Sequence, residues 1–278
     1  MTEPLLEVQN LRVRFPTATG PVEVVRGVSF SLGRERLGIV GESGSGKSMT
    51  GRSILRLIRA PGVVTADRLR FEGQDLLSIS EREMRKVRGA RISMVMQDPK
   101  FSLNPVLTVG EQIGEALAVH ERLPRKQIRQ RVLDMLEAVQ IRDPERVFDL
   151  YPHEVSGGMG QRVMIAMMLI PAPSILIADE PTSALDVSVQ GEVLKIIDEL
   201  ITQNGMGLIF ISHDLHLVSA FCDRILVMYR GEVVEECLAS ELDKATHPYT
   251  RGLLASVPRL DETREELPVL DRSQWETA

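Results

Sequence analysis

A glycine-rich segment at residues 41–48, Gly-Glu-Ser-Gly-Ser-Gly-Lys-Ser, constrains the fold of this chain more than any other feature. An apolar run at residues 37–40 precedes it, and a segment of helical character follows from Lys47 to about Ile58. A G-x-x-x-x-G-K-[ST] pattern between a strand and a helix is typical of a loop that binds phosphate groups. Its glycines let backbone N–H groups surround phosphate oxygens, and the helix points its positive dipole end at the anion. A flexible Gly/Ser linker would lack the flanking strand and the Lys-Ser pair.

The side chains of this loop indicate its chemistry. Lys47 can reach the β- and γ-phosphates of a nucleotide, and the Ser48 hydroxyl can ligate Mg²⁺. The loop therefore predicts a nucleoside triphosphatase. The residues expected to contact the nucleotide here are Gly41, Ser43, Gly44, Ser45, Gly46, Lys47, Ser48 and Met49.

Two further elements lie far along the chain. Residues 156–161 read Ser-Gly-Gly-Met-Gly-Gln, and the apolar run at residues 175–178 ends in Asp179 and Glu180. In enzymes with this phosphate-binding loop, an Asp in this position orders the Mg²⁺ shell and its neighbour can polarise the attacking water. Hydrolysis needs a proton acceptor near that water, so Glu180 is the candidate general base. An Asp-Glu-Pro run alone would only end a strand, but together with Lys47 it predicts a catalytic site.

Composition narrows the classes of protein that the chain can represent. With 278 residues, 43% hydrophobic and 26% charged, it can bury a large core, and its formal net charge of −6 argues against a broad nucleic-acid footprint. Cys222 and Cys237 fit neither a disulfide framework nor a zinc site, so both are expected to be buried thiols in a reducing compartment. Residues 1–10 lack the apolar core of a signal peptide, and the longest apolar runs are too short to span a bilayer. We expect a soluble chain.

The order of apolar runs predicts a mixed α/β fold. Alternating strands predict an antiparallel sheet, and fully apolar runs separated by helices predict a parallel sheet covered on both faces. The antiparallel strands are expected at residues 6–15, 22–32 and 69–71, and the buried strands at residues 37–40, 92–96, 175–178, 208–211 and 225–228. From residue 108 to 139 the apolar period becomes helical. The residues on the predicted apolar faces are Ile113, Leu117, Val132, Leu136 and Val139.

These elements predict a P-loop NTPase core of the RecA-like type, with an N-terminal antiparallel β-subdomain and an inserted helical subdomain. We expect the ATPase domain to span residues 1–257, with the helical insertion at about residues 100–172 and a C-terminal extension at residues 258–278. Residues 247–249, His-Pro-Tyr, predict only a turn before a final helix from Thr250 to about Ser256.

The phosphate-binding loop, the SGGxxQ element and the strand that ends in Asp-Glu together resemble the ABC-type ATPases, over nearly the whole chain. That family binds ATP between two subunits, so the resemblance implies that Ser156 and Gly158 of one subunit bind the γ-phosphate held by another subunit's loop. It also implies that Gln97 touches Mg²⁺ or water and that His213 contacts the γ-phosphate. The other implied nucleotide contacts are Phe15, which would stack on adenine, Gly157, Gln161, and Asp186 in the loop that crosses to the partner subunit.

The resemblance further implies a catalytic set and the cofactors ATP and Mg²⁺. The expected metal ligands are Ser48, Gln97 and Asp179, and the expected catalytic residues are Lys47, Gln97, Glu180 and His213. One departure from the family pattern is Gly160, which replaces a larger residue and weakens the helix start by up to about 1 kcal/mol relative to Ala. No thiol follows Cys237, so no iron–sulfur cluster is expected.

Three segments without a catalytic role indicate a subgroup within the ABC-type ATPases. Residues 102–105 (Ser-Leu-Asn-Pro), 151–154 (Tyr-Pro-His-Glu) and 246–251 (Thr-His-Pro-Tyr-Thr-Arg) resemble the ATPase subunits of bacterial oligopeptide, dipeptide and nickel importers. This resemblance implies a peripheral protein on the cytoplasmic face of the inner membrane, with no nucleic-acid partner. Its expected partners are a second, non-identical ABC ATPase, two transmembrane permease subunits and an extracytoplasmic solute-binding protein.

The expected function is ATP hydrolysis coupled to the uptake of peptides or a related small solute, and two other functions stay open. A soluble ABC ATPase of translation or DNA repair would share the motifs. Translation factors usually carry two cassettes and repair ATPases a long coiled coil, whereas this chain shows one phosphate-binding loop and no long heptad run. A regulatory subunit that binds ATP with little turnover is disfavoured by Glu180 and His213 but kept open by Gly160.

Overall fold

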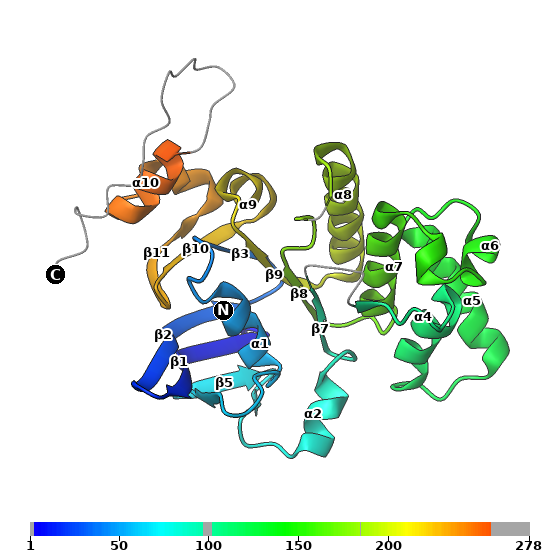
Figure 1. The fold of residues 1–278 in the computed structure, drawn as a ribbon, viewed down its shortest axis with the longest axis horizontal. Helices are drawn as coiled ribbons and strands as arrows, with labels where there is room; N and C mark the ends of the chain where they lie inside the picture. Colours follow the sequence, from blue (N-terminus) through cyan, green and yellow to red (C-terminus); the bar gives the residue numbers. More distant parts are fainter. Residues whose placement is uncertain (1–2, 97–101, 184, 257–278) are drawn as a thin grey trace. The chain divides into compact units, whose positions relative to one another are not determined.

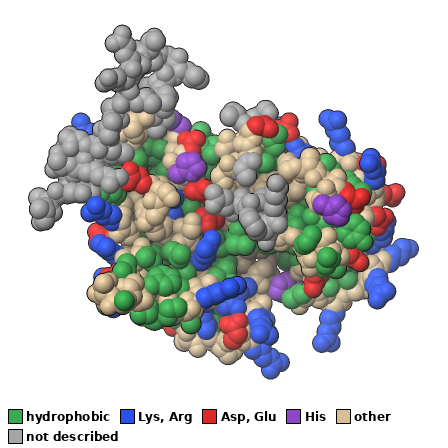
Figure 2. Space-filling model, in the orientation of Figure 1, with side chains coloured by type: hydrophobic (Ala, Val, Ile, Leu, Met, Phe, Trp, Pro, Cys, Tyr) green, Lys and Arg blue, Asp and Glu red, His purple; other side chains and the backbone are tan. Residues whose placement is uncertain are grey.

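The structure is a computed structural model that describes residues 3–96, 102–183 and 185–256. The chain divides into two compact units, in which Figure 1 labels elements where there is room: residues 1–77 together with 209–278, and residues 78–208. The phosphate-binding loop lies in the first unit, and the Ser-Gly-Gly and Asp-Glu elements lie in the second. Within the described ranges, no helix combines the length and the apolar character needed to cross a membrane. Basic and acidic side chains are interspersed over the face drawn in Figure 2.

The first unit begins with an antiparallel sheet, as the alternating pattern predicts. Its strands are β1 (Leu6–Thr17), β2 (Gly20–Leu32), β4 (Val63–Thr65), β5 (Arg68–Phe71) and β6 (Gln74–Asp75). They follow the order β2-β1-β5-β6, and β4 pairs with β1 off this path. Alternate side chains of β1 face the core, and a register shift between Val8 and Leu11 keeps Leu11 and Val13 on the same buried face as Leu6 and Val8.

The same unit contains the strands that carry the phosphate-binding loop. They are β3 (Arg36–Val40), β9 (Gly207–Ser212, within this unit from Ile209 onward), β10 (Arg224–Tyr229) and β11 (Glu232–Leu238), in the order β11-β10-β3-β9. β3 and β10 are parallel, and β10 forms an antiparallel hairpin with β11. The helices are α1 (Lys47–Ile54), α9 (Leu215–Phe221), the 3₁₀-helix η2 (Ala239–Lys244) and α10 (Pro248–Ser256). Gly38 lets α9 pack closely on β3, since a Cβ there would lie 2.2 Å from Val218 Cγ1.

The second unit is mostly helical, with the parallel strands β7 (Ile92–Val95) and β8 (Ile175–Asp179). Its helices are α2 (Glu81–Val87), α4 (Val109–Ala118), α5 (Arg125–Ala138), α6 (Pro144–Phe148), the 3₁₀-helix η1 (Pro152–Glu154), α7 (Gly157–Leu169) and α8 (Val187–Asn204). The predicted apolar positions are buried, each with 0% exposure: Ile113, Leu117, Val132, Leu136 and Val139. The expected limits of the helical insertion and of the C-terminal extension stay a prediction.

Several elements of the first unit differ from the sequence prediction, which contains neither β4 nor β6. The helix after the phosphate-binding loop ends at Ile54 rather than near Ile58, because Arg56 has a φ of 52°, outside the right-handed helical region. No apolar run marks β11, so the sequence does not predict it. This strand lies at the end of the strand order, and all of its side chains are exposed or half-buried, as an edge strand allows.

Candidate functional site

The phosphate-binding loop connects β3 to α1 and requires glycine for two different reasons. Gly41 and Gly46 have φ values of 155° and 101°, and Gly44 has a φ of 82°. A Cβ would lie 2.1 Å from Met228 O at Gly41 and 2.6 Å from Val24 O at Gly46, but it would meet nothing within 4 Å at Gly44. Backbone from other strands therefore excludes a side chain at Gly41 and Gly46, whereas only the backbone angle favours glycine at position 44.

Helix α1 begins at this loop without a side chain that caps it. Its N-cap residue is Gly46 in the left-handed conformation, and no side-chain oxygen accepts a hydrogen bond there. By contrast, the helices α2, α4, α7, α8 and α9 begin at residues whose side chains accept from the backbone N–H three positions on. These residues are Ser80, Thr108, Ser156, Asp186 and Asp214. An N-terminus without such a cap suits an anion, because its amide groups and its dipole both favour negative charge.

Lys47 is only 5% exposed, and its side chain turns back into the loop. Its Nζ donates to Gly41 O at 2.7 Å and to Glu42 O at 2.9 Å, and it lies 3.5 Å from Ser45 Oγ. The Ser45 amide donates to Glu42 O at 3.1 Å, and Ser45 O accepts from the Gly231 amide at 2.9 Å. An ammonium can be buried here because the loop supplies acceptors. The loop thus holds a positive charge at its centre.

The remaining predicted residues of the first unit lie in this loop and the first turn of α1, directly after β9, and on the antiparallel sheet. Ser43 is exposed, and Ser48 and Met49 are half-buried in the first turn of α1. His213 is exposed and directly follows β9, the strand next to β3 in the sheet. Phe15 is half-buried at the far end of β1, where a Cβ on Gly62 would lie 2.7 Å from its Cε1 atom. One edge of the Phe15 ring therefore packs against backbone.

In the second unit, Asp179 and Glu180 stand in the predicted place at the end of β8. Asp179 is its last residue and is 3% exposed. Glu180 has a φ of 50°, a left-handed conformation that costs a non-glycine residue roughly 1–2 kcal/mol. The Glu180 carbonyl accepts from the Ser183 amide at 3.3 Å and from Ser183 Oγ at 3.1 Å, which stabilises this turn. Backbone strain of this kind is concentrated at functional sites.

The Ser-Gly-Gly element forms the first turn of α7. Ser156 is its N-cap, with Oγ accepting from the Met159 amide at 3.3 Å. Gly157 is open on its Cβ side, whereas a Cβ on Gly158 would lie 3.0 Å from Val189 Cγ1. The helix runs through the buried Gly160 without a break.

Two other predicted residues of this unit have structural partners. Gln161 is 1% exposed, and its Nε2 donates to the carbonyl of Pro181, directly after Glu180. Asp186 caps α8, with Oδ1 accepting from the Val189 amide at 3.0 Å. Their predicted nucleotide contacts stay predictions. Gln97 lies outside the described residues.

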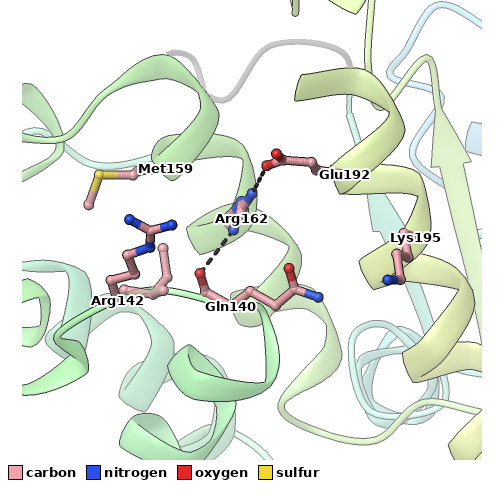
Figure 3. Close-up of a pocket in the computed structure, with 7 residues that line it drawn as sticks. Gln140, Arg142, Met159, Arg162, Glu192 and Lys195 are labelled. Atoms are coloured by element: carbon pink, nitrogen blue, oxygen red, sulfur yellow. Dashed lines mark hydrogen bonds and ion pairs between the residues drawn. The ribbon is translucent and has the colours of Figure 1, made fainter. Parts of the chain in front are cut away.

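A surface pocket of about 730 Å³ also lies on the second unit, between α7, α8 and the segment before α6 (Figure 3). The lining residues are Gln140, Ile141, Arg142, Met159, Arg162, Glu192 and Lys195. Arg162 donates to Gln140 O at 2.9 Å and forms an ion pair with Glu192. None of the predicted nucleotide-binding residues lines this pocket.

Comparison with known proteins identifies the family. A family model described as ABC transporter matches residues 25–183. The chain is 49% identical over 272 residues to the dipeptide transport ATP-binding protein DppD of Bacillus subtilis (strain 168), with 97% of this chain and 81% of that protein covered. It is 48% identical over 265 residues to the oligopeptide transport ATP-binding protein OppD of the same organism, with 94% and 74% covered.

Solved ATP-binding cassettes share the fold. The dimeric post-hydrolysis state of the cassette MJ0796, bound to ADP and Pi, has a TM-score of 0.75 at 26% identity and covers 84% of this chain and 98% of its own. The cbiO1 protein of Clostridium perfringens, part of the ABC transporter complex cbiONQ, has a TM-score of 0.74 at 28% identity, with 87% and 92% covered. The chain belongs to the ABC transporter family. It is an ABC-type ATPase with the P-loop NTPase fold, so the prediction of family and fold is confirmed.

Proposed function

We propose that this chain is the ATP-hydrolysing subunit of a bacterial ABC importer that takes up peptides or a related small solute. The observation that carries the proposal is the phosphate-binding loop, in which Lys47 lies buried among backbone carbonyls beside the N-terminus of α1. Importer function and solute class are supported by relatives named for dipeptide transport and peptide import, which are 49% and 47% identical over 97% and 98% of the chain.

In this proposal the loop binds the phosphates of ATP. Lys47 Nζ exchanges its carbonyl acceptors for β- and γ-phosphate oxygens, and the amides at the start of α1 receive the remaining charge. Phe15 stacks on the adenine. Support for the ring's role is its half-buried position at a strand end, which leaves part of the ring accessible.

Ser48, Asp179 and Gln97 hold Mg²⁺ in this proposal. Hydroxyl, carboxylate and amide oxygens are the ligands that this ion prefers, and a carboxylate that is only 3% exposed, as that of Asp179 is, gains from a bound cation. When bound, Mg²⁺ would neutralise charge on the transferred phosphoryl group.

Glu180 accepts the proton of the attacking water in the proposed hydrolysis. The water oxygen forms a bond to the γ-phosphorus while the bond between that phosphorus and the β–γ bridging oxygen breaks, and ADP leaves. His213 contacts the γ-phosphate, and Gln97 contacts Mg²⁺ or the water. The left-handed backbone of Glu180 supports its role, because the Ser183 hydrogen bonds hold the residue in one conformation.

The proposed complex contains more than this chain. The ATP site of a second, non-identical ABC ATPase would be completed by residues of this chain. These residues are Ser156, Gly157, Gly158, Gln161 and Asp186. Two transmembrane permease subunits would bind this pair at the cytoplasmic face of the inner membrane, and an extracytoplasmic binding protein would deliver the solute. The names of the peptide-import relatives support an importer assembly.

The test is an affinity purification of the tagged full chain from gently solubilised native membranes, with the Lys47→Ala variant as a control for nucleotide dependence. Recovery of a second ATPase and two polytopic permeases supports the importer assignment. Recovery with ribosomes or DNA-repair proteins and without any permease would show that the chain is a soluble ABC ATPase instead.

A further inference from the structure

The His-Pro-Tyr segment is part of the folded core rather than the plain turn that the sequence predicts. Pro248 is the first residue of α10, and Tyr249 is the next. The Tyr249 side chain is 0% exposed and is among the largest fully buried side chains of the described chain. A tyrosine hydroxyl at this depth requires a hydrogen-bond partner, because an unpaired buried polar group is costly.

The phosphate-binding loop supplies one such partner. Tyr249 Oη accepts a hydrogen bond from the Glu42 amide at 2.9 Å, across 207 residues of sequence. The Glu42 carbonyl accepts from Lys47 Nζ at 2.9 Å and from the Ser45 amide at 3.1 Å. Glu42 is therefore held through its amide by α10 and through its carbonyl by the residues that form the phosphate cradle.

Further contacts keep the Tyr249 ring in place. It packs on Tyr229 at the end of β10, with ring centroids 4.4 Å apart and ring planes at 42°. The Tyr249 amide donates to His247 Nδ1 at 3.2 Å. Glu235 on β11 anchors the residues that precede α10. Its Oε1 accepts from the Thr246 amide at 2.6 Å, from Thr246 Oγ1 at 3.2 Å and from the His247 amide at 3.3 Å.

The same contacts set the charge state of Glu235. Burial raises the pKa of this carboxyl, but the nearby Thr250 hydroxyl and the hydrogen bonds from Thr246 and His247 lower it more, so the net pKa is below its usual value. The ionised carboxylate is therefore the form that anchors the segment.

We propose that Tyr249 is a positioning residue for ATP binding, which fixes the backbone of the phosphate-binding loop from the C-terminal helix. This inference rests on the proposed function, since it assumes that the loop binds ATP. Tyr249 touches the loop backbone and acts on the nucleotide only through Glu42. A loop whose amides already point in the binding geometry loses less conformational freedom when phosphate binds, so affinity is higher.

The test compares Tyr249→Phe with Ser256→Ala in the full chain. Tyr249→Phe removes only the hydroxyl and keeps the ring contact. Ser256→Ala removes a hydroxyl from the same helix, one that bonds to Leu253 O at 2.9 Å and is remote in sequence from the loop contact. The measurements are the equilibrium affinity for Mg²⁺ with the slowly hydrolysed analogue AMP-PNP, and the hydrogen-exchange rate of the Glu42 amide.

For Tyr249→Phe we expect affinity to fall about 3- to 10-fold, the effect of one lost hydrogen bond, and the Glu42 amide to exchange faster. Ser256→Ala should change neither quantity. A purely structural role would lower the melting temperature of Tyr249→Phe but leave the affinity of the folded protein and the Glu42 exchange rate unchanged, and that result overturns the inference.

Two further outcomes keep the inference testable. Where Tyr249→Phe yields too little folded protein, Glu235→Gln loosens the anchor and leaves Tyr249 intact. It should speed Glu42 exchange, and an unchanged rate overturns the inference. Failure of the unsubstituted chain to bind AMP-PNP at all would contradict the proposed function, whereas binding that Tyr249→Phe leaves unaltered contradicts only the positioning role.

Discussion

Alanine substitution at two glycines of the phosphate-binding loop separates steric exclusion from backbone strain. Gly44 and Gly46 both have positive φ values, 82° and 101°. A Cβ at Gly44 meets nothing within 4 Å, but at Gly46 it lies 2.6 Å from Val24 O, a backbone atom of β2. The two variants therefore share the conformational penalty and differ in the clash.

The magnitudes follow from these two contributions. A left-handed alanine costs roughly 1–2 kcal/mol, and reduced freedom of the unfolded chain returns about 0.4–1 kcal/mol, so Gly44→Ala should destabilise the fold by roughly 1 kcal/mol. Gly46→Ala carries the same contributions and an overpacking penalty of about 1–3 kcal/mol, since the Val24 carbonyl belongs to a paired strand and cannot swing away like a side chain. The expected difference between the two variants is therefore about 1–3 kcal/mol.

Urea unfolding of the nucleotide-free chain, followed by circular dichroism, measures this difference. The unfolded-state contribution is the same for both glycines and cancels. Equal destabilisation by Gly44→Ala and Gly46→Ala would refute the steric reasoning, and so would a smaller effect at Gly46. Slopes that differ between the variants would show that the unfolding transitions are not comparable.

Three other predictions concern catalysis, acid stability and thiol reactivity. Glu180→Gln should lower steady-state ATP hydrolysis by about 10²- to 10⁴-fold and leave AMP-PNP affinity within about twofold, because it removes a proton acceptor and keeps the shape. The folded-state pKa of Glu235 is depressed, so its stabilisation is present above the ordinary value of 4.5 and is lost as pH falls through the folded-state pKa. The melting-temperature difference between the parent and Glu235→Gln should shrink over that range. Burial raises the pKa of the Cys222 thiol to about 12, so iodoacetamide at pH 8 should modify it more slowly than the half-buried Cys237.

Each of these predictions has a control. For Glu180→Gln, the exposed Glu3→Gln should leave hydrolysis unchanged, and full activity of Glu180→Gln would remove the residue from the catalytic role. A melting-temperature difference that stays constant as pH falls from well above 4.5 to well below it would contradict the pKa direction at Glu235. Equal alkylation rates for the two thiols, read by peptide mass spectrometry, would contradict the burial of Cys222, and both rates should converge in urea.

Local sequence signals account for most of the candidate nucleotide site in the first unit. The apolar strand, the three loop glycines and the Lys-Ser pair are neighbours in sequence, so their structural requirements can be read together. Glu180 shows the opposite case. It precedes Pro181, a position that favours extended backbone, yet it has a φ of 50°. The hydrogen bonds from Ser183 that accompany this conformation depend on the geometry of the whole turn. No single residue type in the sequence predicts them.

The contacts between segments that are distant in sequence could not be predicted from the sequence. Nothing near Tyr249 points to Glu42, and a proline-containing segment before a helix is ordinarily a turn. Likewise, the SGGxxQ pattern gives no sign that the Gln161 amide donates to Pro181 O inside the second unit. Such residues are recognised only when the partner element is in place, because burial and pairing belong to the tertiary fold.

Helix α1 begins at a glycine, so its N-cap residue has no side chain that could accept a hydrogen bond from the backbone of the first turn. In α2 and α7 a serine hydroxyl accepts from the backbone at the helix start, whereas Gly46 offers no side chain for this, so a bound anion can take that position in α1. A bound phosphate would thus serve as a structural component as well as a reactant. Ligand at 100 times its dissociation constant adds about 2.7 kcal/mol to the stability of the folded state. The cellular nucleotide concentration would then set how firmly this part of the molecule is folded, and each cycle of nucleotide release would loosen it.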